Sequence, residues 1–100
     1  MGALVEGTDF FVRRLGGEGA TEVIVYTIAT VDDGDTIALT LADYGIATDG
    51  FLACDGYIQS TANSIIVAEA PTTAVSAGVL TITVGGSTDN KKRTYRVLGI

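Results

Sequence analysis

A chain of 100 residues with 47% hydrophobic residues is long enough for one modest core and too apolar to stay disordered. Its net charge is −6, histidine is absent, and the lone Cys54 excludes a framework of internal disulfides. No stretch approaches the ~18 apolar residues of a membrane helix. The first residues lack the basic and apolar regions of a signal peptide, so we expect a soluble protein.

The first twenty residues predict an N-terminal arm or edge strand that ends in a glycine hinge, and residues 21–100 predict the folded domain. Within the arm, FFVRRL at 10–15 is one short strand, and GGEG at 16–19 is the hinge. The two phenylalanines and two arginines of this strand fit an arm that becomes ordered on contact with a partner.

Residues 21–31, TEVIVYTIATV, give the strongest strand signal because apolar and β-branched residues continue without a break. Both faces of this strand are largely apolar. One face is therefore expected to pack on a second sheet and the other against a subunit contact. The turn DDGD at 32–35 and the alternating DTIALTL at 35–41 follow, and the two strands are predicted to form a hairpin.

Residues 42–50 break the alternation and predict a loop with at most one helical turn. Alternation resumes over 51–60, and the turn TANS at 61–64 leads into a return strand over 64–70. Gly56, inside the first of these strands, predicts a bulge or the close approach of another backbone.

Pro71 ends the return strand because it cannot donate a hydrogen bond to a ladder. Residues 71–78 predict a loop or short edge strand, 79–84 a strand with alternate side chains inward, and 93–100 a closing strand. Six to eight short strands without a substantial helix predict an all-β, single-domain antiparallel β-sandwich or small barrel.

The acidic turn supplies the metal candidates of the sequence, Asp32, Asp33 and Asp35. Clustered carboxylates suit Ca²⁺, but the spaced acids and final glutamate of an EF-hand loop are absent, so a plain turn is favoured. No two carboxylates stand out as an acid–base pair, and Cys54 has no histidine to activate it. We therefore expect a protein that is not an enzyme and needs no cofactor.

Basic residues are confined to the two ends of the sequence, and residues 15–90 contain no lysine or arginine. An acidic body of this kind repels phosphate backbones, so no nucleic acid is expected as a partner. The basic segments could instead dock on an acidic surface of a neighbouring protein. The predicted interface residues are Phe10, Phe11, Arg13, Arg14, Lys91, Lys92, Arg93 and Arg96.

Three segments share a texture of Thr-rich alternating strands with an acidic turn and a short closing strand: DGDTIALTLADYGI, SIIVAEAPTTAVSAGVLTITVGG and KKRTYRVLGI. In this texture the chain resembles the small all-β structural proteins of tailed viruses of bacteria and archaea. The resemblance implies a virion component, such as a capsid decoration or cement protein. It also implies a homo-oligomer, with a trimer favoured, that docks on a larger capsid or tail protein.

Two other classes stay open, a surface module of the adhesin type and a carbohydrate-binding β-sandwich module. The second would need several aromatic side chains on one exposed face. Alternation places Phe51 and Tyr57 on the same side of their strand, although packing between sheets is the favoured explanation of such a pair.

Overall fold

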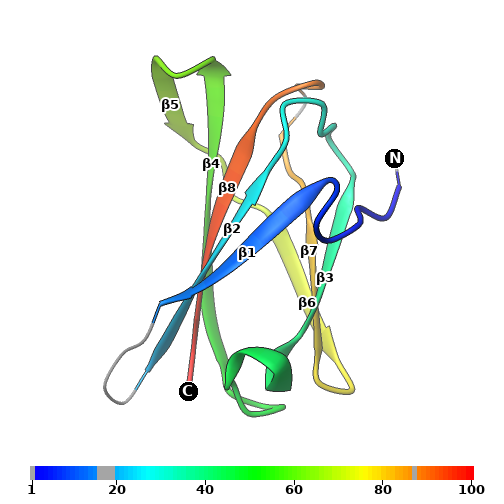
Figure 1. The fold of residues 1–100 in the computed structure, drawn as a ribbon, viewed down its shortest axis with the longest axis vertical. Coiled ribbons are helices and arrows are strands. Elements are labelled where there is room, and N and C mark those ends of the chain that lie inside the picture. Colours follow the sequence, from blue (N-terminus) through cyan, green and yellow to red (C-terminus); the bar gives the residue numbers. More distant parts are fainter. Residues whose placement is uncertain (1, 16–19, 87) are drawn as a thin grey trace.

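The computed structural model describes residues 2–15, 20–86 and 88–100, and it confirms an all-β, single-domain sandwich (Figure 1). The larger antiparallel sheet has the strand order β1-β2-β8-β4-β5, and the smaller has the order β3-β7-β6. The strands are β1 (Phe10–Leu15), β2 (Thr21–Thr27), β3 (Thr36–Thr40), β4 (Phe51–Thr61), β5 (Ile65–Ala68), β6 (Thr72–Ser76), β7 (Val79–Thr83) and β8 (Arg93–Gly99). The predicted glycine hinge, 16–19, lies outside the described residues.

Alternating side chains from both sheets fill the space between them. On β3 and β7, Ile37, Leu39, Leu80 and Ile82 are at most 2% exposed, which confirms the inward faces expected for these strands. The short 3-10 helix η1 (Leu41–Tyr44) lies at the lower end of the sandwich in Figure 1, and its Leu41 is buried. The core consists of Phe10, Val23, Val25, Val31, Ile37, Leu39, Leu41, Ile46, Leu80, Ile82, Val84, Tyr95 and Val97. None of the described helical segments is long and apolar enough to cross a membrane.

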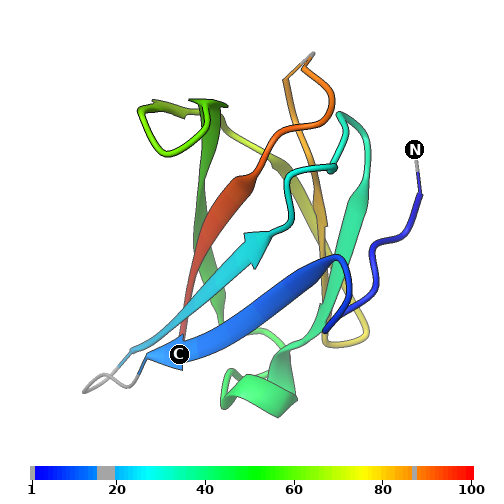
Figure 2. The same cartoon turned by 45° about the horizontal axis from the view of Figure 1, so that its top comes forward.

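The hairpin predicted from residues 21–31 and 35–41 is wrong. β2 ends at Thr27 and pairs with β1 and β8, whereas β3 pairs with β7 in the other sheet. Residues 28–35 therefore cross from one sheet to the other (Figure 2), and Val31 is buried on the way. A turn sequence reverses the chain, but it does not decide whether the flanking strands pair with each other.

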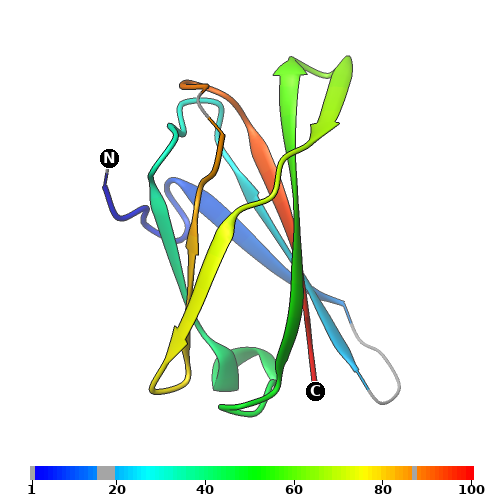
Figure 3. The same ribbon diagram turned by 180° about the vertical axis from the view of Figure 1, so that it is seen from behind.

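The return strand is confirmed, because β5 pairs antiparallel with β4 after a turn at residues 62–64. The segment 71–78 contains the edge strand β6, which Ala77 and Gly78, both at positive φ, join to β7 in a tight hairpin. β5 and β6 are the last strands of their two sheets and are separated by residues 69–71 only. Both sheets therefore end on the same side of the sandwich (Figure 3).

Gly56 lies at a close approach of two backbones, as predicted, but the irregularities of β4 lie elsewhere. The register shifts fall between Phe51 and Ala53 and between Gln59 and Thr61. A Cβ atom at Gly56 would collide with the carbonyl oxygen of Glu69 and lie 2.8 Å from a ring carbon of Tyr95. Only glycine fits where the chain leaves β5 and crosses β4.

Candidate functional site: the Arg93 junction and the β5–β6 side

Two of the residues predicted for an interface are buried within the described chain and present no surface to a partner. Phe10 is 2% exposed because alternation along β1 directs it, with Val12, toward the second sheet. Arg93 is fully buried because it shares the inner face of β8 with Tyr95 and Val97. The sequence contained a signal for this burial: Tyr95 and Val97 face the core, and strict alternation along the strand puts position 93 on the same face.

The remaining basic residues do not gather into one basic end. The guanidinium of Arg14 lies beside Gly45 at the end of η1, while the ammonium of Lys91 donates to the carbonyl of Ser60 at 3.1 Å. Arg96 is 52% exposed and forms an ion pair with Asp55 at 3.0 Å. Docking through a single basic patch therefore has no support in the fold. Arg13, Arg14 and Lys92 are at least partly exposed, and Phe11 stacks on Tyr26 with ring centroids 5.4 Å apart.

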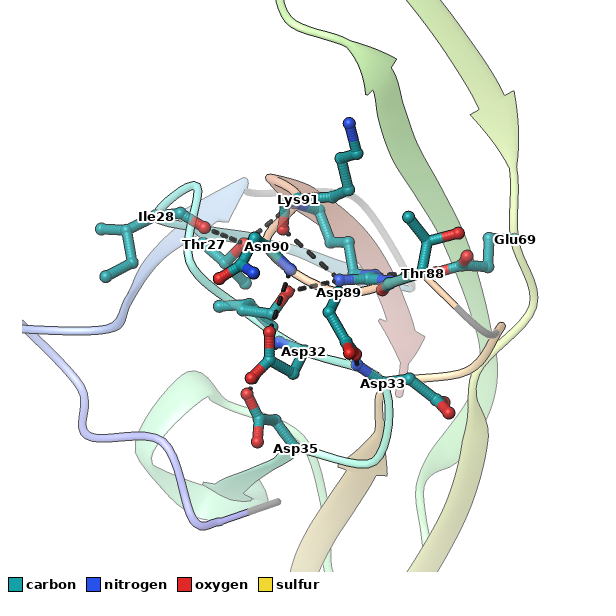
Figure 4. Close-up of polar contacts among 12 residues, drawn as sticks. Thr27, Ile28, Asp32, Asp33, Asp35, Glu69, Thr88, Asp89, Asn90 and Lys91 are labelled. Carbon is teal, nitrogen blue, oxygen red and sulfur yellow. Dashed lines mark hydrogen bonds and ion pairs between the residues drawn. The ribbon is translucent and has the colours of Figure 1, made fainter.

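The buried side chain of Arg93 connects three segments at the end of the sandwich where β8 begins. These segments are the crossing at residues 28–35, Glu69 after β5, and residues 88–91, and together with Arg93 they are called the Arg93 junction (Figure 4). Its Nε donates to Oε1 of Glu69 at 2.8 Å, which forms a largely buried ion pair. Its Nη1 donates to the carbonyls of Val31 at 2.7 Å and Lys91 at 3.4 Å, and its Nη2 donates to the carbonyl of Thr88. A buried guanidinium whose donors are used in this way organises loops and leaves little for a ligand.

The acidic turn at residues 32–35 is part of the same junction, and its carboxylates accept hydrogen bonds from backbone amides. Asp35 is 8% exposed and accepts the amides of Gly2 and Asp32, each at 2.9 Å. Asp32 in turn accepts the amide of Asn90 at 2.9 Å, and Asp33 donates its own amide to a further carboxylate across the junction. The described residues include no group of three or more side chains arranged to hold a metal ion. The carboxylates instead fix the crossing between the two sheets.

An exposed surface is formed by β5 and β6, the strands in which the two sheets end. It is called the β5–β6 side and consists of residues 65–68 and 72–76. Every residue of the two strands is exposed. Ile65, Ile66 and Val67 are 52%, 55% and 46% exposed, and Val75 is 41% exposed. Burying a whole side chain of this size contributes about 1.5–3 kcal/mol, so the side leaves several kcal/mol of apolar stabilisation unrealised.

Val75 shows why this side is open. It stands opposite Leu80 in the register of β6 and β7, so both project toward the inner face of the small sheet. Leu80 is fully buried, but the larger sheet does not reach over Val75. The core therefore thins toward β6 and ends in side chains that meet solvent.

The β5–β6 side is also almost free of charge. Residues 56–88 contain a single charged residue, Glu69, in a chain with a net charge of −6. That carboxylate points inward to Arg93 and is 13% exposed. The two strands thus carry no charged side chain, and the apolar part of this side is formed by β5 and Val75, on a protein with a net charge of −6.

The four sheet edges differ in how they are protected from pairing with another chain. β1 carries Arg13 and Arg14, and β3 is covered by the N-terminal segment, where Leu4 donates to Thr36 at 2.8 Å. β6 carries mainly small polar side chains, whereas β5 presents Ile-Ile-Val-Ala without a charge or a proline. Natural edges normally avoid such a sequence, because an unprotected edge is a template for a further strand.

A second uncovered surface is the outer face of the large sheet. The register places Phe11, Tyr26, Thr94 and Tyr57 in one row across β1, β2, β8 and β4. Tyr57 is 40% exposed, and the others are partly buried by their neighbours alone. The expectation that one face of β2 packs on the second sheet is confirmed by the burial of Val23 and Val25. Its other face has no covering layer within the described chain, and the subunit contact expected there stays a prediction.

A shallow hollow of ≈ 310 Å³ lies where β4 meets β5, beside Cys54. Burial, followed by the charge of Asp55, raises the pKa of the Cys54 thiol to about 11, which leaves it protonated and weakly nucleophilic at neutral pH. Burial also raises the pKa of Tyr95, whose hydroxyl has no hydrogen-bond partner among the described residues. The hollow therefore presents no activated nucleophile.

Comparisons with known proteins identify no family. No family model matches the sequence, and no curated protein matches it. Among solved structures, the fold is similar to the bovine atadenovirus type 4 fibre head protein, with a TM-score of 0.47 and 13% sequence identity. The similarity covers 89% of this chain and 83% of that chain. At this level the neighbour establishes neither a shared family nor a shared function.

Proposed function

We propose that this chain is a non-enzymatic structural protein of a virus particle, a capsid decoration or stabilisation protein that self-assembles and docks on a larger capsid or tail protein. The observation that carries the proposal is the amount of apolar surface that a single copy leaves uncovered. The three apolar residues that begin β5, Ile65, Ile66 and Val67, follow one another in the chain and are 52%, 55% and 46% exposed. Contiguous exposed apolar surface on a small domain indicates a protein–protein contact.

Two further observations support a structural role. The buried guanidinium of Arg93 and the acidic turn hold loops in place, so these polar groups of the interior stabilise the fold. The placement in a virus particle follows from the resemblance of the three segments quoted above to structural proteins of tailed viruses. That resemblance also favours a trimer.

The direct test is the mass of the protein in solution. Native mass spectrometry and light scattering over a dilution series should show a homo-oligomer, with three copies as the expected number. A strict monomer at the highest concentration would contradict self-assembly. Capsid, portal or terminase genes beside this gene would support the virion assignment, and a hydrolase or transporter operon would contradict it.

The aromatic row on the outer face favours one alternative, a carbohydrate-binding module. Tyr57 and the stacked pair Phe11–Tyr26 share this face, and sugars bind to such platforms by stacking on aromatic rings. A glycan array would reveal binding that Tyr57→Ala weakens and Leu52→Ala leaves intact. An array without any bound glycan removes this alternative.

A further inference from the structure

We propose that the β5–β6 side is the surface through which copies of this chain contact one another, with the edge of β5 as its centre. The inference rests on the proposed self-assembly and names the surface that carries it. The occupant is a second copy, and the first argument for it is electrostatic. Two copies that each carry a charge of −6 repel wherever their acidic surfaces meet.

The β5–β6 side avoids this repulsion. From residue 56 to residue 88 the only charge is Glu69, which Arg93 neutralises at 2.8 Å inside the protein. Two identical neutral surfaces can approach without bringing like charges together. The centres of protein–protein interfaces are likewise depleted in charged residues.

The second argument is the contrast among the sheet edges. β1 is protected by arginines and β3 by the N-terminal segment, but β5 exposes an apolar strand with free backbone groups along one side. Every copy carries the same unprotected edge, so the contact can repeat around a three-fold axis with the β5 of one copy against the β5–β6 side of the next. Strand addition at β5 would cover Ile66 and its neighbours and bring Val75 under a second layer.

The experiment compares charged substitutions on this side with the same substitution elsewhere. Ile66→Lys and Val75→Lys place a charge on β5 and β6, and Ala38→Lys places it at an exposed position on the outer face of β3. All three positions are exposed strand residues, so the folded state should tolerate each change, and urea denaturation checks that it does. Val75→Thr is a fourth variant that keeps the shape and removes only apolar character.

We expect Ile66→Lys and Val75→Lys to raise the dissociation constant of the oligomer at least about a hundredfold. Val75→Thr should raise it less, and Ala38→Lys should leave it unchanged. An oligomer of unaltered mass in both lysine variants would overturn this inference and leave self-assembly standing. A wild-type protein that is monomeric but loses binding to virus particles on Ile66→Lys would show that another protein covers this side, which also overturns the inference.

Discussion

The Arg93 junction buries a charged side chain, whereas the β5–β6 side leaves apolar side chains exposed. At the junction a full positive charge is buried, and Glu69 together with three carbonyl groups uses its donors. On the β5–β6 side, Ile66 and Val75 are about half exposed and have no cover. The two regions are only a few residues apart, because Glu69 directly follows β5.

This contrast separates what the chain completes by itself from what it leaves for a partner. Charges are costly to bury, and the fold buries Arg93 only with its partners in place. Apolar side chains are normally the first to be buried, yet four large ones remain exposed in β5 and β6. The internally satisfied region therefore stabilises the monomer, and the unsatisfied one is where we expect contacts with other chains.

The largest effect is expected from breaking the junction with Arg93→Met. Removing the guanidinium leaves the Glu69 carboxylate and the carbonyl of Val31 without their donor, and loss of one partner of a buried ion pair costs about 3–5 kcal/mol. The free energy of unfolding from urea denaturation measures this loss. Arg96→Met is the matched control, because its ion pairs are exposed and contribute at most about 1 kcal/mol.

Equal losses in the two methionine variants would show that the junction is no more important than a surface ion pair. If Arg93→Met fails to fold, Glu69→Gln gives the graded version of the same test. The amide oxygen still accepts from Nε of Arg93, so we expect a smaller loss than for the methionine variant.

The next largest loss of stability is expected from Gly56→Ala, because Gly56 contacts Glu69 where the β5–β6 side meets the Arg93 junction. In Gly56→Ala the new methyl group would collide with the carbonyl of Glu69 and lie 3.0 Å from Pro71. The strand crossing, held by the Glu69 amide on the Gly56 carbonyl at 2.8 Å, must then shift. Overpacking of this kind costs about 1–3 kcal/mol, measurable by thermal or urea unfolding. Gly2→Ala is the control, since a methyl group there meets nothing within 4 Å, and equal stability of the two variants would contradict the close approach.

The stability of the protein as a function of pH tests whether solvent reaches the Cys54 thiol, which lies beside β5. Its pKa is raised from 9.0 to about 11 in the folded protein, so the neutral thiol is favoured by folding. The stabilisation is complete below pH 9 and is lost as the pH rises from 9 to 11, because the unfolded thiol ionises first. Cys54→Ala should reduce the fall in stability over this range, whereas both proteins share the contribution of their tyrosines. Parallel pH profiles of the two proteins would mean that solvent reaches the thiol freely.

Much of the fold was predictable because strand alternation is a local property. The inward residues of β3 and β7 and the return of the chain after residues 61–64 followed from the sequence alone. The pairing of β3 with β7 did not follow, because residues 28–35 owe their path to Arg93 and the carboxylates of the junction. These contacts join positions about sixty residues apart, such as Asp32 and Asn90.

The candidate surfaces were harder to predict for the same reason. The run Lys91-Lys92-Arg93 has the composition of a surface segment, and only the alternation of β8 places its last member inside. The run Ile-Ile-Val-Ala of β5 has the composition of a core strand, but its exposure depends on how far the opposite sheet extends. That extent is set by the lengths and packing of strands that are distant in sequence.

The smallest effect is expected at Tyr95, which lies between the two regions with its ring against Gly56. Its hydroxyl is buried and finds no hydrogen-bond partner among the described residues. A buried hydroxyl without a partner has lost its water and gained nothing, so Tyr95→Phe should leave the free energy of unfolding unchanged or raise it by up to about 1 kcal/mol. Tyr44→Phe is the contrasting variant, because that hydroxyl donates to Glu6 at 3.2 Å on the surface and its removal should cost a little stability. A Tyr95→Phe protein that is less stable than Tyr44→Phe would show that the Tyr95 hydroxyl does form a hydrogen bond. The hydrogen-bonded network of the Arg93 junction would then extend to Tyr95, toward the β5–β6 side.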